Sequence, residues 1–394
     1  MAGISERFGR PLRLGIIGGG PDSWIGKMHR SAAELDGAWN AVAGVFSSDP
    51  SRSRAAGVAL GFDAARSYGD LAEMLERERQ RADPIDAVAI MTPNDAHYAG
   101  CVAALDAGLD VVCDKPVTHD FREACDLVLR TRRQRRLFAI AHAYSAYPMT
   151  RLARHLVRDG VLGALRLVRV EYIQSGLATR LEDGPQNNRL RWVLDSARSG
   201  QALVMSAIGC HAQHLACFVA GLRALRLCAD AVAVVPGREV IDYTSAMIEF
   251  ERGARGTMTV TQAAAGGEND IRLTVYGEKG MLDWSHRDAS YLKLALQGEP
   301  ARVIGRGDPF LPPEIVALGR TPRGHPEGLR EAFANIYVEV ARERMARALG
   351  EPPPEHPYPR IEEGAHTMAF IEACLASQRT GGWVDVAPVP AAIS

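Results

Sequence analysis

The chain has 394 residues, of which 47% are hydrophobic and 24% charged, and its formal net charge is −1. This length accommodates two domains of ordinary size, and the balanced charge gives no sign of a nucleic-acid-binding surface. No run of 18 apolar residues occurs and the N-terminus lacks a hydrophobic core segment, so neither a membrane span nor a signal peptide is expected. Seven cysteines lie in apolar segments without C-x-x-C spacing. They predict reduced core residues in a cytoplasmic protein, and neither a zinc site nor a disulfide framework.

The first informative segment is a short β-rich run followed at once by glycines. Residues 12–17 read Leu-Arg-Leu-Gly-Ile-Ile, then come Gly18, Gly19 and Gly20, and an expected helix follows through residue 35. A strand, a glycine turn and a helix can bind a pyrophosphate, because glycines let the backbone approach the phosphates and the helix N-terminus offers free N–H groups. The spacing departs from plain G-x-G-x-x-G, since an insertion separates Gly20 from Gly26.

Strands and helices then alternate through the first 146 residues. The pattern predicts the following strands and helices: strands at 39–46, 85–91, 109–113 and 138–141, and helices at 51–60, 68–79, 97–107 and 120–133. Such alternation implies a parallel sheet with right-handed crossovers. We therefore predict an α/β protein with a dinucleotide-binding Rossmann domain over residues 1–146 and a second domain over 147–394.

The residues after the second predicted strand leave the choice of dinucleotide open. NAD-binding domains place an acidic residue there for the ribose hydroxyl. Here Ser47 and Ser48 are neutral, Asp49 lies one step further along, and Arg52 could instead meet the 2′-phosphate of NADP. Both cofactors are compatible with these residues.

The fourth strand closes on Asp114-Lys115-Pro116. Of 46 basic residues only four are lysines: Lys27, Lys115, Lys279 and Lys293. A lysine at the carboxyl end of a parallel strand lies where small-molecule chemistry occurs in open α/β sheets. In a chain that otherwise uses arginine, it indicates a titratable ammonium that arginine cannot replace.

Four ordered motifs carry a resemblance to a known family: Gly18-x-Gly20…Gly26-x-x-His29, Thr92-Pro93-Asn94-x-x-His97, Asp114-Lys115-Pro116 and Gly209-Cys210-His211. The chain resembles the glucose-fructose oxidoreductase / inositol dehydrogenase (Gfo/Idh/MocA) family. The resemblance implies an NAD(P)-dependent dehydrogenase that oxidises a secondary hydroxyl, or reduces the ketone, on a sugar, cyclitol or glycoside ring. It also implies a C-terminal α+β domain with a large, mainly antiparallel open sheet.

The resemblance extends to individual residues. It implies these cofactor-binding positions: Gly18, Gly20, Trp24, Ile25, Ser47, Ser48, Arg52, Thr92, Pro93, Asn94, His97, Asp114, Lys115 and Pro116. Family members often have a cis proline at the last of these. The long loop at 20–26, the segment 46–50 and His142-x-Tyr144-x-x-Tyr147 are most similar to levoglucosan dehydrogenase-like members, which favour NAD.

One motif departs from the family pattern. The family commonly reads D-x-G-x-H where this chain reads Ala207-Ile208-Gly209-Cys210-His211. Lys115 and His211 then remain as the catalytic acid–base candidates. Three accounts are open: a changed substrate pose, a carboxylate supplied by the substrate or another loop, or loss of dehydrogenase activity. The last would make the chain a non-catalytic NAD-binding sensor, and a redox-neutral NAD-dependent glycoside-processing enzyme is a further alternative.

The second half alternates as antiparallel strands do. Expected strands and helices are the following: strands at 168–173, 231–235, 243–250, 256–262, 271–276, 281–284 and 291–296, and helices at 205–221, from 328 through 337, and at 362–377. Residues 277–280 form a predicted hairpin turn. One broad face of this sheet must be covered and few helices are available after Trp284, so a homodimer or homotetramer through this sheet is expected.

Polar and aromatic residues around these elements supply the predicted substrate site. The candidates are His142, Tyr144, Gln174, Trp192, His214 and His325. Trp192 lies in a long polar segment, residues 175–200, and long loops of this kind in compact domains are usually functional or disordered. An aromatic face there would stack on the C–H surface of a sugar.

Overall fold

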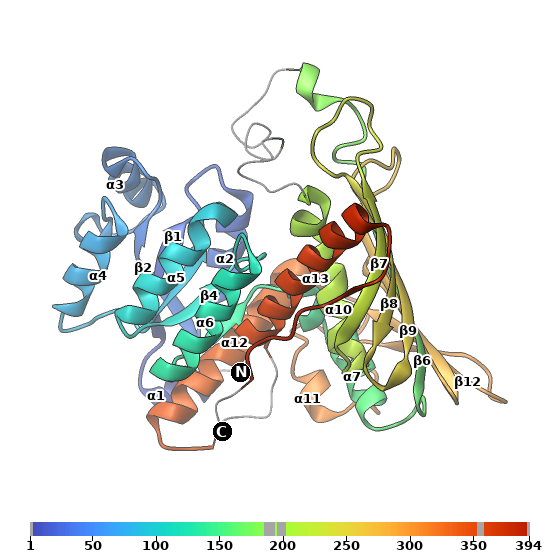
Figure 1. Cartoon of the computed structure of the whole chain (residues 1–394). Helices are drawn as coiled ribbons and strands as arrows, with labels where there is room; N and C mark the ends of the chain where they lie inside the picture. The colour runs from blue at the N-terminus through green and yellow to red at the C-terminus, as the bar shows by residue number, and fades with distance from the viewer. Residues whose placement is uncertain (1–2, 185–193, 195–201, 353–357, 392–394) are drawn as a thin grey trace. The chain divides into compact units, whose positions relative to one another are not determined.

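The computed structural model describes residues 3–184, 194, 202–352 and 358–391 (Figure 1). It divides into two units. The first contains residues 1–146, 329–364 and 390–394, and the second contains 147–328 and 365–389. Each unit is built on its own sheet, and the predicted α/β fold class is confirmed.

The first unit is a parallel five-stranded sheet in the order β2-β1-β3-β4-β5. Its strands are β1 (Leu12–Gly18), β2 (Trp39–Val45), β3 (Ala87–Met91), β4 (Asp110–Cys113) and β5 (Phe138–Ile140). Its helices up to residue 146 are α1 (Gly3–Phe8), α2 (Trp24–Glu34), α3 (Pro50–Ala59), η1 (Ala64–Arg66), α4 (Leu71–Arg79), η2 (Asn94–Ala96), α5 (His97–Asp106), α6 (Phe121–Gln134) and η3 (Ala143–Ala146). The late helix α12 (Leu329–Ala348) packs on α2 within the same unit. The strand order reverses between β1 and β3, the point at which open α/β sheets bind their ligands.

Polar caps fix where several of these helices begin. The side chains of Ser23, Asp49, Asp70 and Asp120 each accept a hydrogen bond from a backbone N–H in the first turn of the next helix. Such caps satisfy N–H groups that have no partner inside the helix. The predicted start of the helix at residue 68 is therefore wrong, because Asp70 caps α4 and the helix begins at Leu71.

The second unit contains a nine-stranded sheet in the order β13-β12-β11-β10-β6-β9-β8-β7-β14. Its strands are β6 (Leu165–Ile173), β7 (Ala224–Val232), β8 (Tyr243–Phe250), β9 (Arg255–Thr261), β10 (Asp270–Gly277), β11 (Gly280–Ser285), β12 (Tyr291–Leu296), β13 (Arg302–Gly305) and β14 (Val384–Asp385). Neighbouring strands run antiparallel except β6 and β9, which are parallel. The expectation of a large, mainly antiparallel sheet is confirmed.

The helical segments of the second unit are α7 (Pro148–Arg158), η4 (Leu181–Asp183), η5 (Met205–Gly209), α10 (Cys210–Ala220), η6 (Glu251–Gly253), η7 (His286–Asp288) and α11 (Pro313–Val316). Helix α13 (Ile361–Thr380) spans the division between the units. Helices α7 and α10 pack against the sheet, α10 on β6 and β10, and α7 on β11 and β12 (Figure 1). Buried and accessible residues alternate along β6 and β8, so one face of the sheet carries the core.

Two predicted elements of the second unit change in the structure. The strand expected at 231–235 is β7, which begins at Ala224 and pairs with β8 over its whole length. Arg226 and Asp230 interrupt the apolar alternation of β7, so the sequence pattern did not predict its first half. The helix expected at 205–221 opens with a π-turn, η5, before the regular α10.

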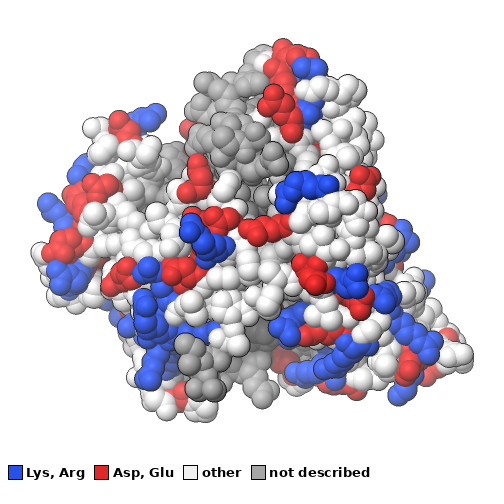
Figure 2. All heavy atoms as spheres, in the orientation of Figure 1, with Lys and Arg blue, Asp and Glu red and all other residues white. Residues whose placement is uncertain are grey.

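Charge is distributed evenly over the visible surface. Figure 2 shows basic and acidic side chains interspersed, with neither sign gathered into one patch. Among the described residues, no helix is long and apolar enough to cross a membrane.

Candidate active site

The predicted cofactor residues converge on one edge of the first unit's sheet. Because all five strands are parallel, their carboxyl ends share that edge. Gly18 ends β1, Ser47 follows β2, Thr92 follows β3 and Asp114 follows β4. The structure thus brings together motifs that lie almost a hundred residues apart in the sequence.

The glycine turn is shaped so that no side chain fits beneath it. Gly18 and Gly19 have positive φ angles of 86° and 64°. A Cβ atom on Gly26 would lie 2.4 Å from the Gly19 carbonyl oxygen, and one on Gly18 would lie 2.8 Å from the carbonyl oxygen of Met91. Ser23 accepts a hydrogen bond from Gly26 N at 3.0 Å and so caps α2. A bare backbone turn leading into a helix N-terminus fits a dinucleotide pyrophosphate.

In the segment after β2, the carboxylate of Asp49 caps a helix. Asp49 Oδ1 accepts a hydrogen bond from Arg52 N at 2.7 Å, which caps α3. Ser47 accepts from Asp49 N at 3.1 Å. The Arg52 side chain is 78% exposed, and its Nε lies 3.9 Å from Asp49 Oδ1. Ser47 and Ser48 thus follow the end of β2, and Arg52 lies in the first turn of α3.

One imidazole joins the second and third motifs. His97, at the start of α5, is fully buried. Its Nε2 lies 2.8 Å from the Thr92 carbonyl oxygen and its Nδ1 lies 2.8 Å from that of Pro116. Burial lowers the pKa of His97, against the raising effects of Asp114 and of the two carbonyl contacts. His97 thus ties the loop after β3 to the loop after β4, a role that its spacing from Thr92 alone did not reveal.

The Lys115–Pro116 peptide bond is cis, as the resemblance implied. Lys115 is partly buried, whereas Lys27, Lys279 and Lys293 are exposed. Beyond β5, the two predicted substrate residues of this unit, His142 and Tyr144, are buried at 2% and 4% exposure.

In the second unit, polar side chains gather at the ends of β6 and β9. These parallel strands finish side by side, with Ile173 opposite Thr261. Gln174 follows the first and Gln262 the second, and Gln262 Nε2 donates to Gln174 Oε1 at 2.8 Å. Gln174 also donates to Asn269 Oδ1, which accepts from the Tyr172 hydroxyl at 2.7 Å.

This polar group continues to a histidine that the sequence analysis missed. His286 Nδ1 lies 3.0 Å from the Asn269 carbonyl oxygen, and its Nε2 lies 3.1 Å from the Tyr147 hydroxyl. Amides, hydroxyls and an imidazole at one sheet end are groups that can hydrogen-bond a polyhydroxylated ring. The sequence signal for this polar group is that Gln174 and Gln262 each directly follow a strand.

The predicted histidines of α10 have different surroundings. His211 is partly accessible in the first turn. His214 is 3% exposed and stacks on Phe218 with ring centroids 5.7 Å apart. Ala207, in the π-turn before them, packs against an apolar cluster of Leu177, Leu203 and Val240. The position of the family's aspartate is therefore next to aliphatic side chains.

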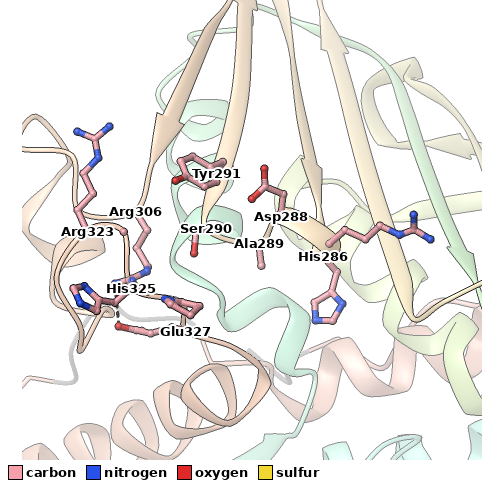
Figure 3. Close-up of a pocket in the computed structure, with 12 residues that line it drawn as sticks. His286, Asp288, Ala289, Ser290, Tyr291, Arg306, Arg323, His325 and Glu327 are labelled. Carbon is pink, nitrogen blue, oxygen red and sulfur yellow. Dashed lines mark hydrogen bonds and ion pairs between the residues drawn. The ribbon is translucent and has the colours of Figure 1, made fainter.

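His325 lines a cavity of about 250 Å³ in the second unit, and His286 of the polar group lines the same cavity. Figure 3 shows Arg323 and His325 on one wall and Asp288 and His286 on the other. Arg306, beside Arg323, forms an ion pair with Glu327 at 2.9 Å, and both side chains are almost completely buried. Trp192, the remaining predicted substrate residue, lies outside the described residues.

Comparison with known proteins identifies the family. Residues 12–142 match the family model described as oxidoreductase family, NAD-binding Rossmann fold, and residues 150–283 match the GFO/IDH/MocA C-terminal domain. The Bacillus subtilis oxidoreductase YfiI is 31% identical over 95% of this chain and 97% of its own length. Levoglucosan dehydrogenase of Pseudarthrobacter phenanthrenivorans is 25% identical over 96% of this chain and 99% of its own length.

Solved structures agree with these matches. An inositol dehydrogenase homologue from Azotobacter vinelandii, solved with NAD+, has a TM-score of 0.90 and 34% identity, covering 95% of this chain and 97% of its own. The same protein with NADH and myo-inositol has a TM-score of 0.88 and 33% identity, covering 95% and 98%. This chain therefore belongs to the Gfo/Idh/MocA family of oxidoreductases and carries its NAD-binding Rossmann domain.

Proposed function

We propose that this protein is an NAD-dependent dehydrogenase that oxidises a secondary hydroxyl, or reduces the corresponding ketone, on a sugar, cyclitol or glycoside ring. The main support for this proposal is the arrangement of residues at the carboxyl edge of the first unit's sheet. There a side-chain-free glycine turn, the Thr92 loop and Asp114-Lys115-Pro116 lie at neighbouring strand ends, and the His97 ring contacts a carbonyl oxygen of each of the last two. The glycine turn supports binding of a dinucleotide, and Lys115 supports chemistry beside it.

Separate groups of residues have separate tasks in this proposal. The glycine turn and the N-terminus of α2 would hold the pyrophosphate, and Ser47, Ser48 and Arg52 would lie near the ribose. NAD, when bound, supplies the hydride acceptor. Lys115 and His211 are the proposed acid–base groups for the proton of the reacting hydroxyl, and Gln174 and its amide partners are proposed to bind other hydroxyls of the ring.

Reduced-nicotinamide absorbance tests the proposal. Purified protein is mixed with NAD or NADP and with a panel that begins with myo-inositol and levoglucosan, the ligands of its relatives, and extends to other cyclitols, sugars and glycosides. We expect an increase in absorbance with NAD and one class of polyol, and no increase in Lys115→Ala. A flat trace for every substrate, with calorimetry showing that NAD binds, would contradict the dehydrogenase.

The surroundings of Ala207 favour a second candidate, a protein that holds NAD without net oxidation. It would be either a sensor or a redox-neutral glycoside-processing enzyme. The family's carboxylate is absent and its position is apolar. Incubation of NAD-loaded protein with glycosides, followed by chromatography of the sugars, separates the two. A cleaved sugar without NADH indicates the enzyme, and unchanged sugars with retained NAD indicate the sensor.

We also infer that the second unit's sheet is a homo-oligomer interface. The residues on the face opposite the core include Leu167, Met247 and Val303, each at least half exposed. Leu167 is the β-partner of Tyr276, which is 37% exposed on the same face. Sedimentation velocity should give a dimer or tetramer, and Met247→Lys combined with Leu167→Lys should weaken it. A monomeric wild type would overturn this part of the proposal.

A further inference from the structure

Three side chains form a buried line behind Lys115 in the first unit. His29 on α2 is fully buried, and its Nδ1 lies 2.7 Å from the hydroxyl of Tyr337 on α12. Its Nε2 lies 3.7 Å from Asp114 Oδ1, which is an ion-pair distance and too long for a hydrogen bond. Neither of these two atoms has a hydrogen-bond partner among the described residues. His29 Nε2 and Asp114 Oδ1 therefore face each other, and Asp114 is the residue directly before Lys115.

Further contacts hold Tyr337 and His29 in place. Trp39 Nε1 donates to the Tyr337 carbonyl oxygen at 2.9 Å. The His29 ring packs edge-on against Phe333, with centroids 5.0 Å apart, and against Tyr337 at 5.9 Å. Sequence position cannot explain the contact, since 308 residues separate His29 from Tyr337. The packing of α12 on α2 therefore orients the His29 imidazole.

The hydrogen bond also selects the tautomer of His29. Burial raises the pKa of the Tyr337 hydroxyl well above its usual range, and the charge of Asp114 raises it further. The hydroxyl is therefore protonated at neutral pH and can donate to His29 Nδ1. A neutral imidazole that accepts at Nδ1 carries its proton on Nε2, the nitrogen that faces Asp114.

Four groups face the Asp114 carboxylate: His29 from α2, His97 from α5, Tyr337 from α12 and the adjacent Lys115. Burial alone would raise the pKa of Asp114. The interactions with His29, Lys115 and His97 outweigh it and lower the pKa to about 2. Asp114, whose side chain is 14% exposed, is thus a largely buried, ionised counter-charge beside the lysine.

We propose that His29 and Tyr337 are positioning residues for Lys115, because they hold the Asp114 carboxylate charged and fixed next to it. An ionised neighbour favours the ammonium form of a lysine. This inference rests on the proposed function for its catalytic meaning, since Lys115 is the proton-handling group there. Its physical content, the coupling of four side chains, can be measured without any substrate.

Competitive acetylation of the amines provides that measurement. Limiting acetic anhydride is added between about pH 5 and pH 8, a range across which a lysine of ordinary pKa is mostly protonated. Mass spectrometry then gives the ratio of label on Lys115 to label on the exposed Lys279. In the wild type this ratio should stay constant, because Asp114 keeps its charge throughout.

In Tyr337→Phe and His29→Ala the ratio should rise as the pH falls. Without its partner the buried Asp114 takes up a proton, and Lys115 then loses its counter-charge and its proton more easily. Asp114→Asn should raise the ratio at every pH by about tenfold, the equivalent of one pKa unit. His29→Gln, which restores an N–H donor, should return the ratio toward that of the wild type. A constant ratio in Tyr337→Phe, His29→Ala and Asp114→Asn alike would overturn the proposal.

Tyr358→Phe is the matched control. It removes another buried tyrosine hydroxyl of the same unit, one whose ring contacts Arg360 at 4.8 Å. It should leave the ratio unchanged. A change as large as that in Tyr337→Phe would show a general loosening of the unit and would also overturn the proposal.

Turnover supplies the second readout. In Tyr337→Phe and His29→Ala Asp114 is protonated at higher pH, so the acid limb of the kcat profile should move to higher pH by about one unit, while KM for NAD stays within about twofold. An absence of turnover in the wild type, with the labelling ratios as expected, would contradict the proposed function alone. Normal turnover with constant labelling ratios would contradict the positioning role alone.

Discussion

At the scale of single residues, Lys115 differs from the other three lysines of the chain. It is partly buried where they are exposed, and it follows an ionised buried aspartate. The sequence singled it out by its rarity and its place after a strand. The groups that surround Asp114, however, come from α2, α5 and α12, and no local pattern connects them.

Replacement of Lys115 by arginine tests whether its compact ammonium is needed. Arginine keeps the positive charge but presents a planar guanidinium that does not give up its proton. We expect kcat of Lys115→Arg to fall by about a hundredfold, within the usual range for acid–base catalysis, with the Kd for NAD nearly unchanged. Steady-state kinetics and calorimetry measure the two, and unchanged turnover would remove Lys115 from the mechanism.

A methyl group on Gly26 should block the cofactor turn. Its Cβ would lie 2.4 Å from the Gly19 carbonyl oxygen, so the turn or α2 must shift. We expect Gly26→Ala to weaken NAD binding by at least about tenfold, equal to 1.4 kcal/mol. Gly100→Ala is the control. Gly100 lies within α5, where alanine favours a helix, and its Cβ would meet Ile90 of β3 at an ordinary 3.7 Å. Equal NAD affinities in the two variants would contradict the prediction.

At the scale of elements, short-range chemistry set several helix starts. The caps Asp49, Asp70 and Asp120 are local, and the helices begin directly after them. Elements with weak local signals were less predictable. β7 alternates poorly, and β13 is a four-residue strand held by its neighbour β12. Their pairing partners, which lie elsewhere in the chain, decide their extent.

The segment after β13 depends on one buried ion pair. Arg306 and Glu327 are 6% and 5% exposed, and Arg306 also donates to the Thr321 carbonyl oxygen. Arg306→Ala would leave the buried Glu327 carboxylate with hydrogen bonds from Arg320 N and Thr321 but without its cation, at a cost of about 3–5 kcal/mol. Urea unfolding measures this, and hydrogen exchange should show faster exchange at residues 320–327.

The matched control for that prediction lies on β13, four residues before Arg306. Arg302 pairs with Glu299, and both side chains are more than half exposed. Arg302→Ala should therefore cost less than about 1 kcal/mol. A similar loss of stability in both variants would show that burial of the Arg306 pair is unimportant.

At the scale of the whole molecule, buried ionisable groups should govern the stability toward acid. The pKa of His97 is lowered by burial, so the folded protein resists its protonation. Below about pH 6.5 the unfolded chain binds a proton that the folded protein does not, and the free energy of unfolding must fall as the pH falls. Asp114 contributes only in a lower window, because its stabilisation is lost between the ordinary aspartate value of 3.8 and about 2.

His97→Gln isolates the histidine's part of this dependence. Glutamine keeps a hydrogen-bond donor for a carbonyl but has no proton to gain. Urea unfolding at about pH 7.5 and pH 5.5, on either side of the free histidine value, should show a smaller loss of stability in the variant than in the wild type. The exposed His119→Gln is the control, and equal losses in the wild type and His97→Gln would contradict the assignment.

The sequence by itself determined the strand–glycine–helix start, the alternation of the first unit, the antiparallel second unit and the motif residues of the site. Those features depend on residues close together in the chain, whose periodicity and turn chemistry are local. Only the tertiary structure decided which groups surround them. It placed Tyr337 beside His29, His97 between two loops, and Ala207 against aliphatic side chains. Such contacts follow from the packing of whole elements, and packing joins residues without regard to their separation in sequence.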